Sequence, residues 1–340
     1  MTTHFIQKMW LKAYDKRMRI VLPEGNEPRT LHAAEEAIKN NLADIILIGN
    51  PEEINLSIEL NGYSNIKGKA CIIDPNNHTN MEEYAQLVYE KRKGKGLTIE
   101  LARELIRNPL YLGVVMIIAN HADGEVAGAI NKTGDVLRPA FQLVKTIPGV
   151  SVVSGVFVMV FKDTEFGEDG LLLFADTAVN SNPDEQMLAE IAITTANTSR
   201  DLLGIEPRIA MLSFSSHGSA QNTMVDKVAN AVNIVRERRP DLIIDGEIQL
   251  DAAIVPDVAN QKCPKSPLHG KANILVFPSL DAGNIGYKLA QRFAHADAYG
   301  PLLQGLAAPI NDLSRGCTYD EITNVIALTA CQALLFRNKK

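Results

Sequence analysis

Cysteine is scarce in this 340-residue chain, and the four cysteines that occur lie far apart, at Cys71, Cys263, Cys317 and Cys331. No two of them form a C-x-x-C pair, so the sequence signals neither a zinc site nor a redox motif. The N-terminus also lacks the pattern of a secretory signal. We therefore expect reduced thiols in a cytoplasmic protein.

An excess of positive charge is missing as well. The chain has 34 Lys and Arg residues against 40 Asp and Glu residues, which gives a formal net charge of −6. Broad binding to nucleic acid or to a membrane surface needs a basic face, so the composition argues against both partners. An anionic substrate would have to be met by individual arginines.

Long apolar runs are absent. The longest, residues 150–161, is interrupted by Ser151, Ser154 and Gly155 and is too short to span a bilayer as a helix. Residues 1–17 mix charged and apolar side chains in a pattern typical of an amphipathic helix. No association with a membrane is expected from either segment.

Three well-known motifs are also absent from the sequence. It contains no G-x-x-x-x-G-K-[ST] phosphate loop, no G-x-G-x-x-G dinucleotide fingerprint and no G-x-S-x-G nucleophile turn. A linker, an internal repeat and a low-complexity segment are missing too. At this length we expect two domains, with boundaries near Gly149 and Gly300.

What the chain does contain is an alternation of strand-like and helical segments, which predicts parallel βαβ units with binding loops at the carboxyl ends of the strands. Strands are expected at residues 19–22, 44–48, 70–73, 171–174, 208–214, 243–245 and 273–277. Helices are expected at residues 29–39, 81–93, from 99 onwards, 184–195, 222–238 and 284–294, with another one starting at Pro139.

The most informative stretch is residues 311–321, with the sequence NDLSRGCTYDE. Thr318 stands three residues before Glu321, which is the spacing of a capping box, and a helical pattern follows. Ser314 and Arg315 then lie in the turn before a helix N-terminus, where backbone N–H groups and the helix dipole favour an anion. A guanidinium adds a fork suited to phosphate or carboxylate. The same pattern also fits an ordinary capped helix with a solvated arginine.

Other polar clusters are less specific. Residues 213–219, SFSSHGS, form a strand-to-helix turn that could cradle an anion or could be a serine-capped helix. His217 alone is more typical of a structural histidine. One acidic cluster fits either magnesium or a solvated helix start, and it comprises Asp245, Glu247 and Asp251. Three further acidic residues follow strand-like or apolar runs, where cleft residues gather, namely Asp123, Asp176 and Asp281.

Eight segments, taken in order, resemble the bacterial phosphate acetyltransferase (phosphotransacetylase) family. They are LPEGNEPRT at 22–30, ADG at 122–124 with Gly128, GDVLRPA at 134–140, FAD at 174–176, MLSFS at 211–215 with GSA at 218–220, DGE at 245–247 with DAA at 251–253, AGNI at 282–285 and NDLSRGC at 311–317. The resemblance runs from about residue 15 to the C-terminus, and the ordered set is far more specific than any one segment.

The resemblance implies two three-layer α/β domains, akin to the isocitrate and isopropylmalate dehydrogenases, with the active site in the interdomain cleft. It implies that residues 1–149 and 301–340 form a discontinuous first domain and that residues 150–300 form the second. The implied reaction is acetyl-CoA + phosphate ⇌ acetyl phosphate + CoA, with CoA and phosphate as substrates. The family pattern further implies a homodimer that uses neither a metal nor a nicotinamide cofactor.

The resemblance also assigns roles to individual residues. Those matching Ser314, Arg315 and Glu321 serve catalysis, and those matching Arg92 and Arg138 bind CoA or phosphate. We expect Glu321 to deprotonate the CoA thiol, Ser314 to donate to the acyl group and Arg315 to hold phosphate, by direct attack in a ternary complex. Ser215 and Gly218 are further candidates for substrate binding.

Some positions depart from the family pattern. Many members have Thr-Lys where this chain has Ser216-His217, and Lys where it has Ala308. The usual catalytic aspartate aligns with Glu321, so Asp320 beside it stays open as the base. Other functions also stay open: a phosphate butyryltransferase, a dehydrogenase on the related fold and a non-catalytic CoA-sensing module.

Overall fold

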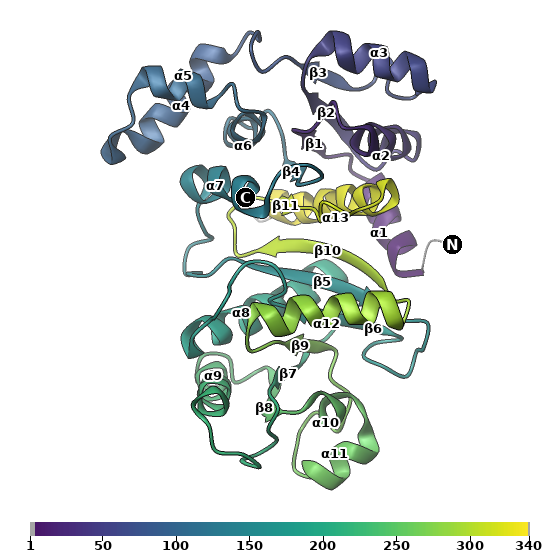
Figure 1. The fold of residues 1–340 in the computed structure, drawn as a ribbon, viewed down its shortest axis with the longest axis vertical. Coiled ribbons are helices and arrows are strands. Elements are labelled where there is room, and N and C mark those ends of the chain that lie inside the picture. The colour runs from purple at the N-terminus through teal and green to yellow at the C-terminus, as the bar shows by residue number, and fades with distance from the viewer. Residues whose placement is uncertain (1–3, 339–340) are drawn as a thin grey trace. The chain divides into compact units, whose positions relative to one another are not determined.

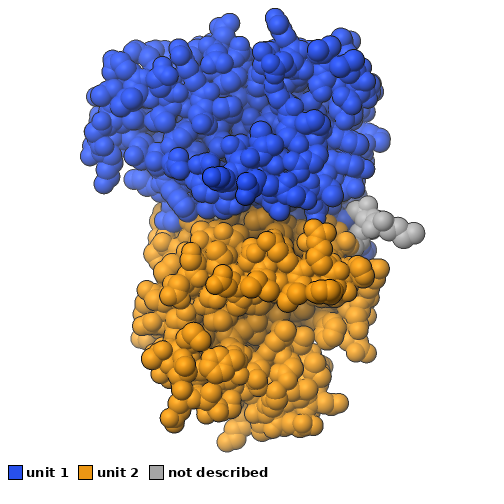
Figure 2. Space-filling model, viewed as in Figure 1, with its two compact units in different colours: residues 1–146, 306–340 blue, residues 147–305 orange. Residues whose placement is uncertain are grey.

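The computed structural model describes residues 4–338 and divides the chain into two compact units. Unit 1 comprises residues 1–146 and 306–340, and unit 2 comprises residues 147–305 (Figure 2). Unit 1 is therefore discontinuous in sequence. The predicted boundaries at Gly149 and Gly300 fall inside unit 2, close to its two ends. Within residues 4–338, no helix combines the length and the apolarity needed to cross a membrane.

Unit 1 is built on a five-stranded parallel sheet in the order β11-β4-β1-β2-β3 (Figure 1). Its strands are β1 (Arg19–Leu22), β2 (Asp44–Ile48), β3 (Cys71–Ile73), β4 (Gly124–Ala127) and β11 (Ile310–Asp312). Strands β1 and β2 read as unbroken apolar runs because helices bury both faces of a parallel sheet. They match the predicted segments, whereas β4 and β11 were not predicted.

Helices surround this sheet. They are α1 (His4–Tyr14), α2 (Pro28–Lys39), α3 (Pro51–Asn61), α4 (Met81–Arg92), α5 (Ile99–Leu105), α6 (Pro109–Ile118), α7 (Thr133–Pro139) and α13 (Tyr319–Asn338), with short η1 (Lys93–Lys95) and η2 (Ala140–Val144). Helix α13 packs against α1, α2 and β4. Its side chains at Ile322, Val325, Ile326, Ala330 and Ala333 are buried, as the helical spacing predicted. The amphipathic helix predicted within residues 1–17 is confirmed by α1 over residues 4–14, while residues 1–3 lie outside the described residues.

The prediction that a helix starts at Pro139 is wrong. Helix α7 begins at Thr133 with Asp135 in its first turn, and Pro139 is its last residue. Since proline has no N–H for the i→i−4 bond, the chain continues in the wider π-helical turn of η2. Arg138 therefore lies in the last turn of a helix and not at an anion-favouring N-terminus.

Unit 2 has a six-stranded sheet in the order β10-β5-β6-β9-β7-β8. Its strands are β5 (Ser154–Val160), β6 (Leu171–Ala175), β7 (Arg208–Leu212), β8 (Ile243–Ile248), β9 (Ile274–Val276) and β10 (Asp297–Gln304). The parallel pairing expected throughout is confirmed for β6-β9-β7-β8 and is wrong for β10-β5 and β5-β6, which are antiparallel. Strand β10 was not predicted because Asp297, Gly300 and Pro301 break its apolar pattern.

The helices of unit 2 are α8 (Glu185–Thr198), α9 (Thr223–Arg238), α10 (Leu250–Ile254), α11 (Pro256–Lys262) and α12 (Leu280–Phe293), with η3 (Ser199–Leu203) extending α8. A buried cluster that includes Phe157, Phe174, Leu275 and Tyr287 fills the space between sheet and helices. The ring of Phe157 stacks on that of Tyr287 with their centroids 4.2 Å apart. Ala210 and Leu212 of β7 belong to this core, and the β7–α9 turn, residues 213–222, follows that strand.

Candidate active site

The turn between β11 and α13 has the predicted geometry. The backbone N–H of Glu321 donates to the Thr318 hydroxyl at 3.2 Å, and the Thr318 N–H donates to the Glu321 carboxylate at 2.8 Å. This reciprocal pair confirms the capping box. Ser314 and Arg315 lie exposed just ahead of it, between the carboxyl end of a parallel strand and the start of a 20-residue helix. The three predicted catalytic residues thus lie in and directly after this turn, with Glu321 in the first turn of α13.

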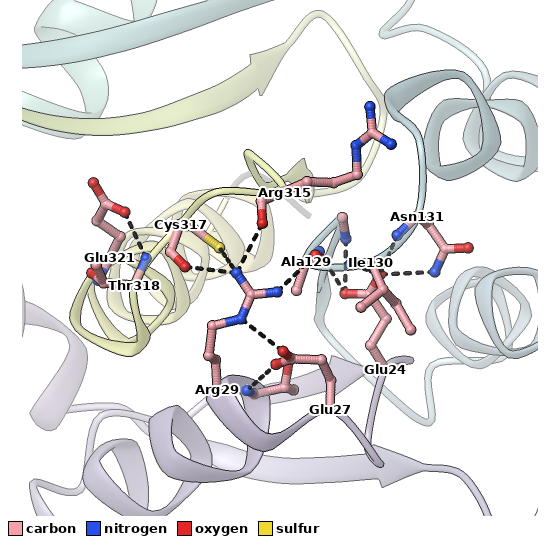
Figure 3. Close-up of polar contacts among 12 residues, drawn as sticks. Glu24, Glu27, Arg29, Ala129, Ile130, Asn131, Arg315, Cys317, Thr318 and Glu321 are labelled. Carbon is pink, nitrogen blue, oxygen red and sulfur yellow. Dashed lines mark hydrogen bonds and ion pairs between the residues drawn. The ribbon is translucent and has the colours of Figure 1, made fainter.

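The Arg315 side chain has no hydrogen bond or ion pair with any residue between 4 and 338. In Figure 3 its guanidinium extends away from the other side chains drawn. A guanidinium in this state keeps its donors available for an external phosphate or carboxylate.

A second arginine binds the backbone of this turn. Arg29, in the first turn of α2, donates through Nη1 to the carbonyl oxygens of Arg315 (2.9 Å) and Cys317 (2.8 Å). Its Nη2 donates to the carbonyl oxygen of Ala129 at 2.9 Å, and its Nε donates to Glu27 at 2.7 Å (Figure 3). The Glu27 contact raises the pKa of Arg29. Arg29 therefore fixes the backbone on which Arg315 stands.

The loop between β4 and α7 is held by a buried carboxylate, Glu24. It accepts hydrogen bonds from four consecutive backbone N–H groups, those of Gly128 (3.0 Å), Ala129 (2.8 Å), Ile130 (3.0 Å) and Asn131 (3.0 Å). The Asn131 side chain adds a fifth bond at 2.7 Å. Sequence reasoning gave no role to Glu24 or Arg29, although both lie in the segment LPEGNEPRT that carries part of the family resemblance.

Next to Glu24 a pocket of about 310 Å³ opens at the carboxyl ends of β1 and β2. Its lining is Pro23, Glu24, Gly25, Asn26, Glu27, Ile48, Gly49, Asn108, Pro109, Leu110, Ile130 and Asn131. The lining combines apolar side chains, three asparagine amides and two glutamates, and it contains no Lys or Arg to pair with an anionic ligand. None of the predicted site residues lines it.

The charges of Arg92 and Arg138 both act on the pKa of one hydroxyl, that of Tyr111 in α6. Burial raises the pKa of the Tyr111 hydroxyl, while the charges of Arg138 and Arg92 both act to lower it. The helices that carry these two predicted CoA-binding arginines, α4 for Arg92 and α7 for Arg138, both pack against α6. Arg138 is exposed and pairs with Asp135 at 3.1 Å.

Cys317 is close to the predicted catalytic residues but is not suited to be a nucleophile. It is buried, and burial raises the pKa of its thiol to about 12. The thiol is therefore protonated at neutral pH, whereas the thiolate is the reactive form.

In unit 2, the predicted substrate-binding residues Ser215 and Gly218 donate to a carboxylate of their own chain. The Ser215 hydroxyl and the Gly218 N–H both donate to Glu247, at 2.9 and 2.7 Å. Glu247 is buried at the end of β8. These two donors of the turn are thus occupied by an internal anion.

The other acidic residues singled out from the sequence also have partners. Asp245 contacts His217 Nε2 (3.0 Å) and Arg236 (3.1 Å), and Asp251 pairs with Lys262 at 2.7 Å. Among the described residues, no three His, Cys, Asp or Glu side chains gather as metal ligands would.

The remaining three acidic residues differ in position. Asp176 follows β6 as expected and is buried, where it accepts from the N–H groups of Gly155 and Ala178. Asp281 lies in the first turn of α12. Asp123 follows an apolar run as expected, but that run is helix α6, and Asp123 precedes β4 and pairs with Arg19 at 2.8 Å.

Comparisons with known proteins agree with this description. A family model described as "Phosphate acetyl/butaryl transferase" matches residues 4–330. The phosphate acetyltransferase of Thermoanaerobacterium thermosaccharolyticum is 53% identical over 328 residues, covering 96% of this chain and 99% of that protein. The crystal structure of a phosphotransacetylase from Streptococcus pyogenes superposes with a TM-score of 0.91 at 43% identity, covering 98% of this chain and 99% of the other.

A more distant structure shows a likeness of fold alone. A protein of Salmonella typhimurium assigned to the 4-hydroxythreonine-4-phosphate dehydrogenases has a TM-score of 0.51 at 11% identity, covering 94% of this chain and 99% of the other. Together the matches define this protein as an acyltransferase on a two-unit α/β fold. Within that class the chain belongs to the phosphate acetyl/butyryl transferase family, which confirms the resemblance drawn from its sequence.

Proposed function

We propose that this protein transfers an acetyl group reversibly between CoA and inorganic phosphate: acetyl-CoA + phosphate ⇌ acetyl phosphate + CoA. The observation that carries the proposal is the β11–α13 turn, where the exposed Arg315 stands beside Ser314 on a backbone fixed by Arg29. A phosphate bound there meets a guanidinium and the positive end of α13 together. The names of the relatives support acetyl as the transferred group.

The proposed mechanism is direct attack in a ternary complex. Glu321 takes the proton from the CoA thiol, and the thiolate sulfur attacks the carbonyl carbon of acetyl phosphate. Ser314 donates to the oxygen on which negative charge develops, and Arg315 holds the phosphate as the C–O bond breaks. Phosphate leaves with the bonding electron pair, so neither an acyl-enzyme nor a cofactor is needed.

Substrate binding is proposed for four further residues. Arg92 and Arg138 would pair with phosphate groups of CoA, since their helices α4 and α7 both pack against α6 and the charges of both act on Tyr111. Ser215 and Gly218 would act through the shape of the β7–α9 turn, because Glu247 already accepts from both.

The test is an assay of phosphate-dependent CoA release from acetyl-CoA and from butyryl-CoA. We expect faster release from acetyl-CoA, and a clear preference for butyryl-CoA would make the protein a phosphate butyryltransferase. Turnover of neither substrate would refute the transferase proposal. NAD reduction with isocitrate or isopropylmalate would then indicate a dehydrogenase, and CoA binding alone would indicate a sensing module.

We further propose that the protein is a cytoplasmic homodimer. An apolar stripe on α12 supports self-association, because Ile285, Leu289 and Phe293 follow one another at i, i+4 and i+8 and are 58%, 49% and 80% exposed. Light scattering at micromolar concentration should give the mass of a dimer, and Leu289→Glu should give that of a monomer. A monomeric wild type would contradict the proposal. The free thiols of Cys71, Cys263, Cys317 and Cys331 fit a reducing compartment.

A further inference from the structure

Asp312, the last residue of β11, is a buried carboxylate to which neither the proposed mechanism nor the sequence assigned a role. It is 2% exposed. Its Oδ2 accepts a hydrogen bond from the Thr133 hydroxyl at 2.6 Å. Its Oδ1 is buried and has no hydrogen-bond partner among the described residues.

The Thr133 contact joins two segments that carry proposed site residues. Thr133 is the first residue of α7, and Arg138 is on the same helix. Asp312 stands two residues before Ser314 in the β11–α13 turn. One short hydrogen bond thus connects the strand that ends at the catalytic turn with the helix that carries a CoA-binding arginine.

The space around Oδ1 depends on a glycine. A Cβ built on Gly128 would lie 2.4 Å from Asp312 Oδ1, and the φ of Gly128 is +115°, a conformation that other residues rarely adopt. The β4–α7 loop therefore approaches the carboxylate as closely as a backbone can. Glu24, which binds the same loop, is close enough for its charge to act on the pKa of Asp312.

This environment disfavours the ionised form. Burial acts to raise the pKa of Asp312, the Thr133 hydroxyl and the Leu313 N–H act to lower it, and Glu24 acts to raise it, so that together they raise the pKa to about 6. The pKa of Asp312 is higher in the folded protein than in the unfolded chain. Its contribution to the free energy of unfolding is therefore fully present below the unfolded pKa near 4 and is lost as the pH rises through 6. Asparagine has the same shape and could also accept from Thr133, without that loss. Because the charge of a carboxylate at this site lowers stability, we look for its role in positioning and not in stability.

We propose that Asp312 is a positioning residue that, through Thr133, sets the place of helix α7 and its Arg138 relative to the Ser314–Arg315 turn. The charged acceptor makes a stronger bond to the Thr133 hydroxyl than a neutral amide does. It therefore holds the CoA-binding cation at a fixed distance from the residues that act on the acyl group. This inference rests on the proposed function.

The test compares the wild type with Asp312→Asn, Thr133→Val and the conservative Thr133→Ser, measuring kcat, the KM for CoA and melting temperature between pH 5 and 8. At pH 7.5 we expect Asp312→Asn and Thr133→Val to lower kcat/KM for CoA by roughly tenfold, the effect of one charge-assisted hydrogen bond. Thr133→Ser keeps the hydroxyl and should stay within about twofold of the wild type. Asp312→Asn should melt no lower than the wild type at pH 7.5.

A pH profile separates this role from simple packing. Below pH 6 the wild-type carboxyl is protonated and resembles the amide, so the activity ratio of Asp312→Asn to wild type should rise towards one. A ratio that stays constant from pH 5 to 8, or equal losses in both Thr133 variants, would overturn the proposal. If Asp312→Asn does not fold, the comparison of Thr133→Val with Thr133→Ser decides by itself. An inactive wild type would refute the proposed function, whereas an active wild type with an unaffected Asp312→Asn would refute the role of Asp312 alone.

Discussion

Two serine-containing turns in this protein look alike in sequence and differ in structure. The β11–α13 turn of unit 1 and the β7–α9 turn of unit 2 each follow a strand with parallel neighbours and lead towards a helix. In unit 1 an internal cation, Arg29, donates hydrogen bonds to carbonyl oxygens of the turn. In unit 2 an internal anion, Glu247, accepts hydrogen bonds from an N–H and an O–H group of the turn.

We expect this difference to determine which turn is open to an external anion. A guanidinium on the carbonyl side fixes the backbone and leaves Arg315 available, whereas a carboxylate on the donor side occupies the groups that would bind phosphate. Serine and glycine at the end of a strand are therefore not sufficient for an anion site. The sign of the internal charge that binds the turn therefore matters as well as the sequence of the turn.

Among the tests of the comparison between the two turns, the largest effect is expected at Glu321. Glu321→Gln keeps the shape and the capping ability of the side chain but removes its basicity, so kcat should fall by about 10²–10⁴-fold, the usual range for a general base. Asp320→Asn should be mild. Steady-state kinetics with acetyl phosphate and CoA measure both.

Thr318→Ala is the control for the capping box. It breaks the box at a cost of about 1 kcal/mol in the free energy of unfolding while the Glu321 carboxylate remains. A loss of kcat in Thr318→Ala equal to that in Glu321→Gln would assign the effect to capping. A larger loss in Asp320→Asn would transfer the role of base to Asp320.

The next largest effect is expected in the β11–α13 turn itself. Ser314→Ala and Arg315→Ala should each lower kcat by about 10²–10³-fold, as the loss of one transition-state donor typically does. Both side chains are exposed, so circular dichroism and melting temperature should stay as in the wild type. Arg337→Ala, an exposed arginine at the far end of α13, is the matched control. Unchanged kcat in either variant would remove that residue from the mechanism.

Arg92→Ala and Arg138→Ala should act on binding more than on chemistry. Each is expected to raise the KM for CoA by roughly 10–100-fold, the effect of one hydrogen bond to a charged group, with a smaller change in kcat. Arg103→Ala, which removes a surface ion pair with Glu82 on α4, should leave the KM unchanged. Normal CoA affinity in both test variants would contradict the assignment.

The smallest effect is expected in unit 2, where it should appear in stability. Glu247→Gln removes the charged acceptor of Ser215 and Gly218, so the free energy of unfolding should fall by about 1–3 kcal/mol. Urea denaturation followed by circular dichroism measures this change. Stability equal to the wild type would mean that Glu247 does not hold the turn, and the contrast between the two turns would disappear.

Local signals in the sequence were enough for part of this structure. The apolar runs of β1 and β2, the period of α9 and the Thr318–Glu321 spacing each depend on neighbours a few residues away, and each is confirmed. Helix α7 shows the limit of such reasoning. Pro139 favours a helix start in general, yet here the chain tolerates it at the end of α7 by widening the next turn.

The parts that could not be predicted depend on contacts between distant segments. Strand β11 has three residues and pairs with β4, so no periodicity marks it. Arg29 reaches the carbonyl oxygen of Arg315 across 286 positions in the chain, and Glu24 reaches the β4–α7 loop across more than 100. Neither spacing nor composition indicates which backbone group a buried side chain will meet.

The discontinuity of unit 1 has a consequence for the order in which the protein is made. Residues 1–146 leave the ribosome without β11, the edge strand of their sheet, and without α13, which packs on β4, β1 and α2. Unit 2 is continuous, so its whole sequence has been synthesised while unit 1 still lacks its last segment. Ser314, Arg315 and Glu321 belong to that segment. Premature termination between residues 139 and 305 would therefore release a chain that holds both arginines proposed to bind CoA and none of the residues proposed for the chemistry.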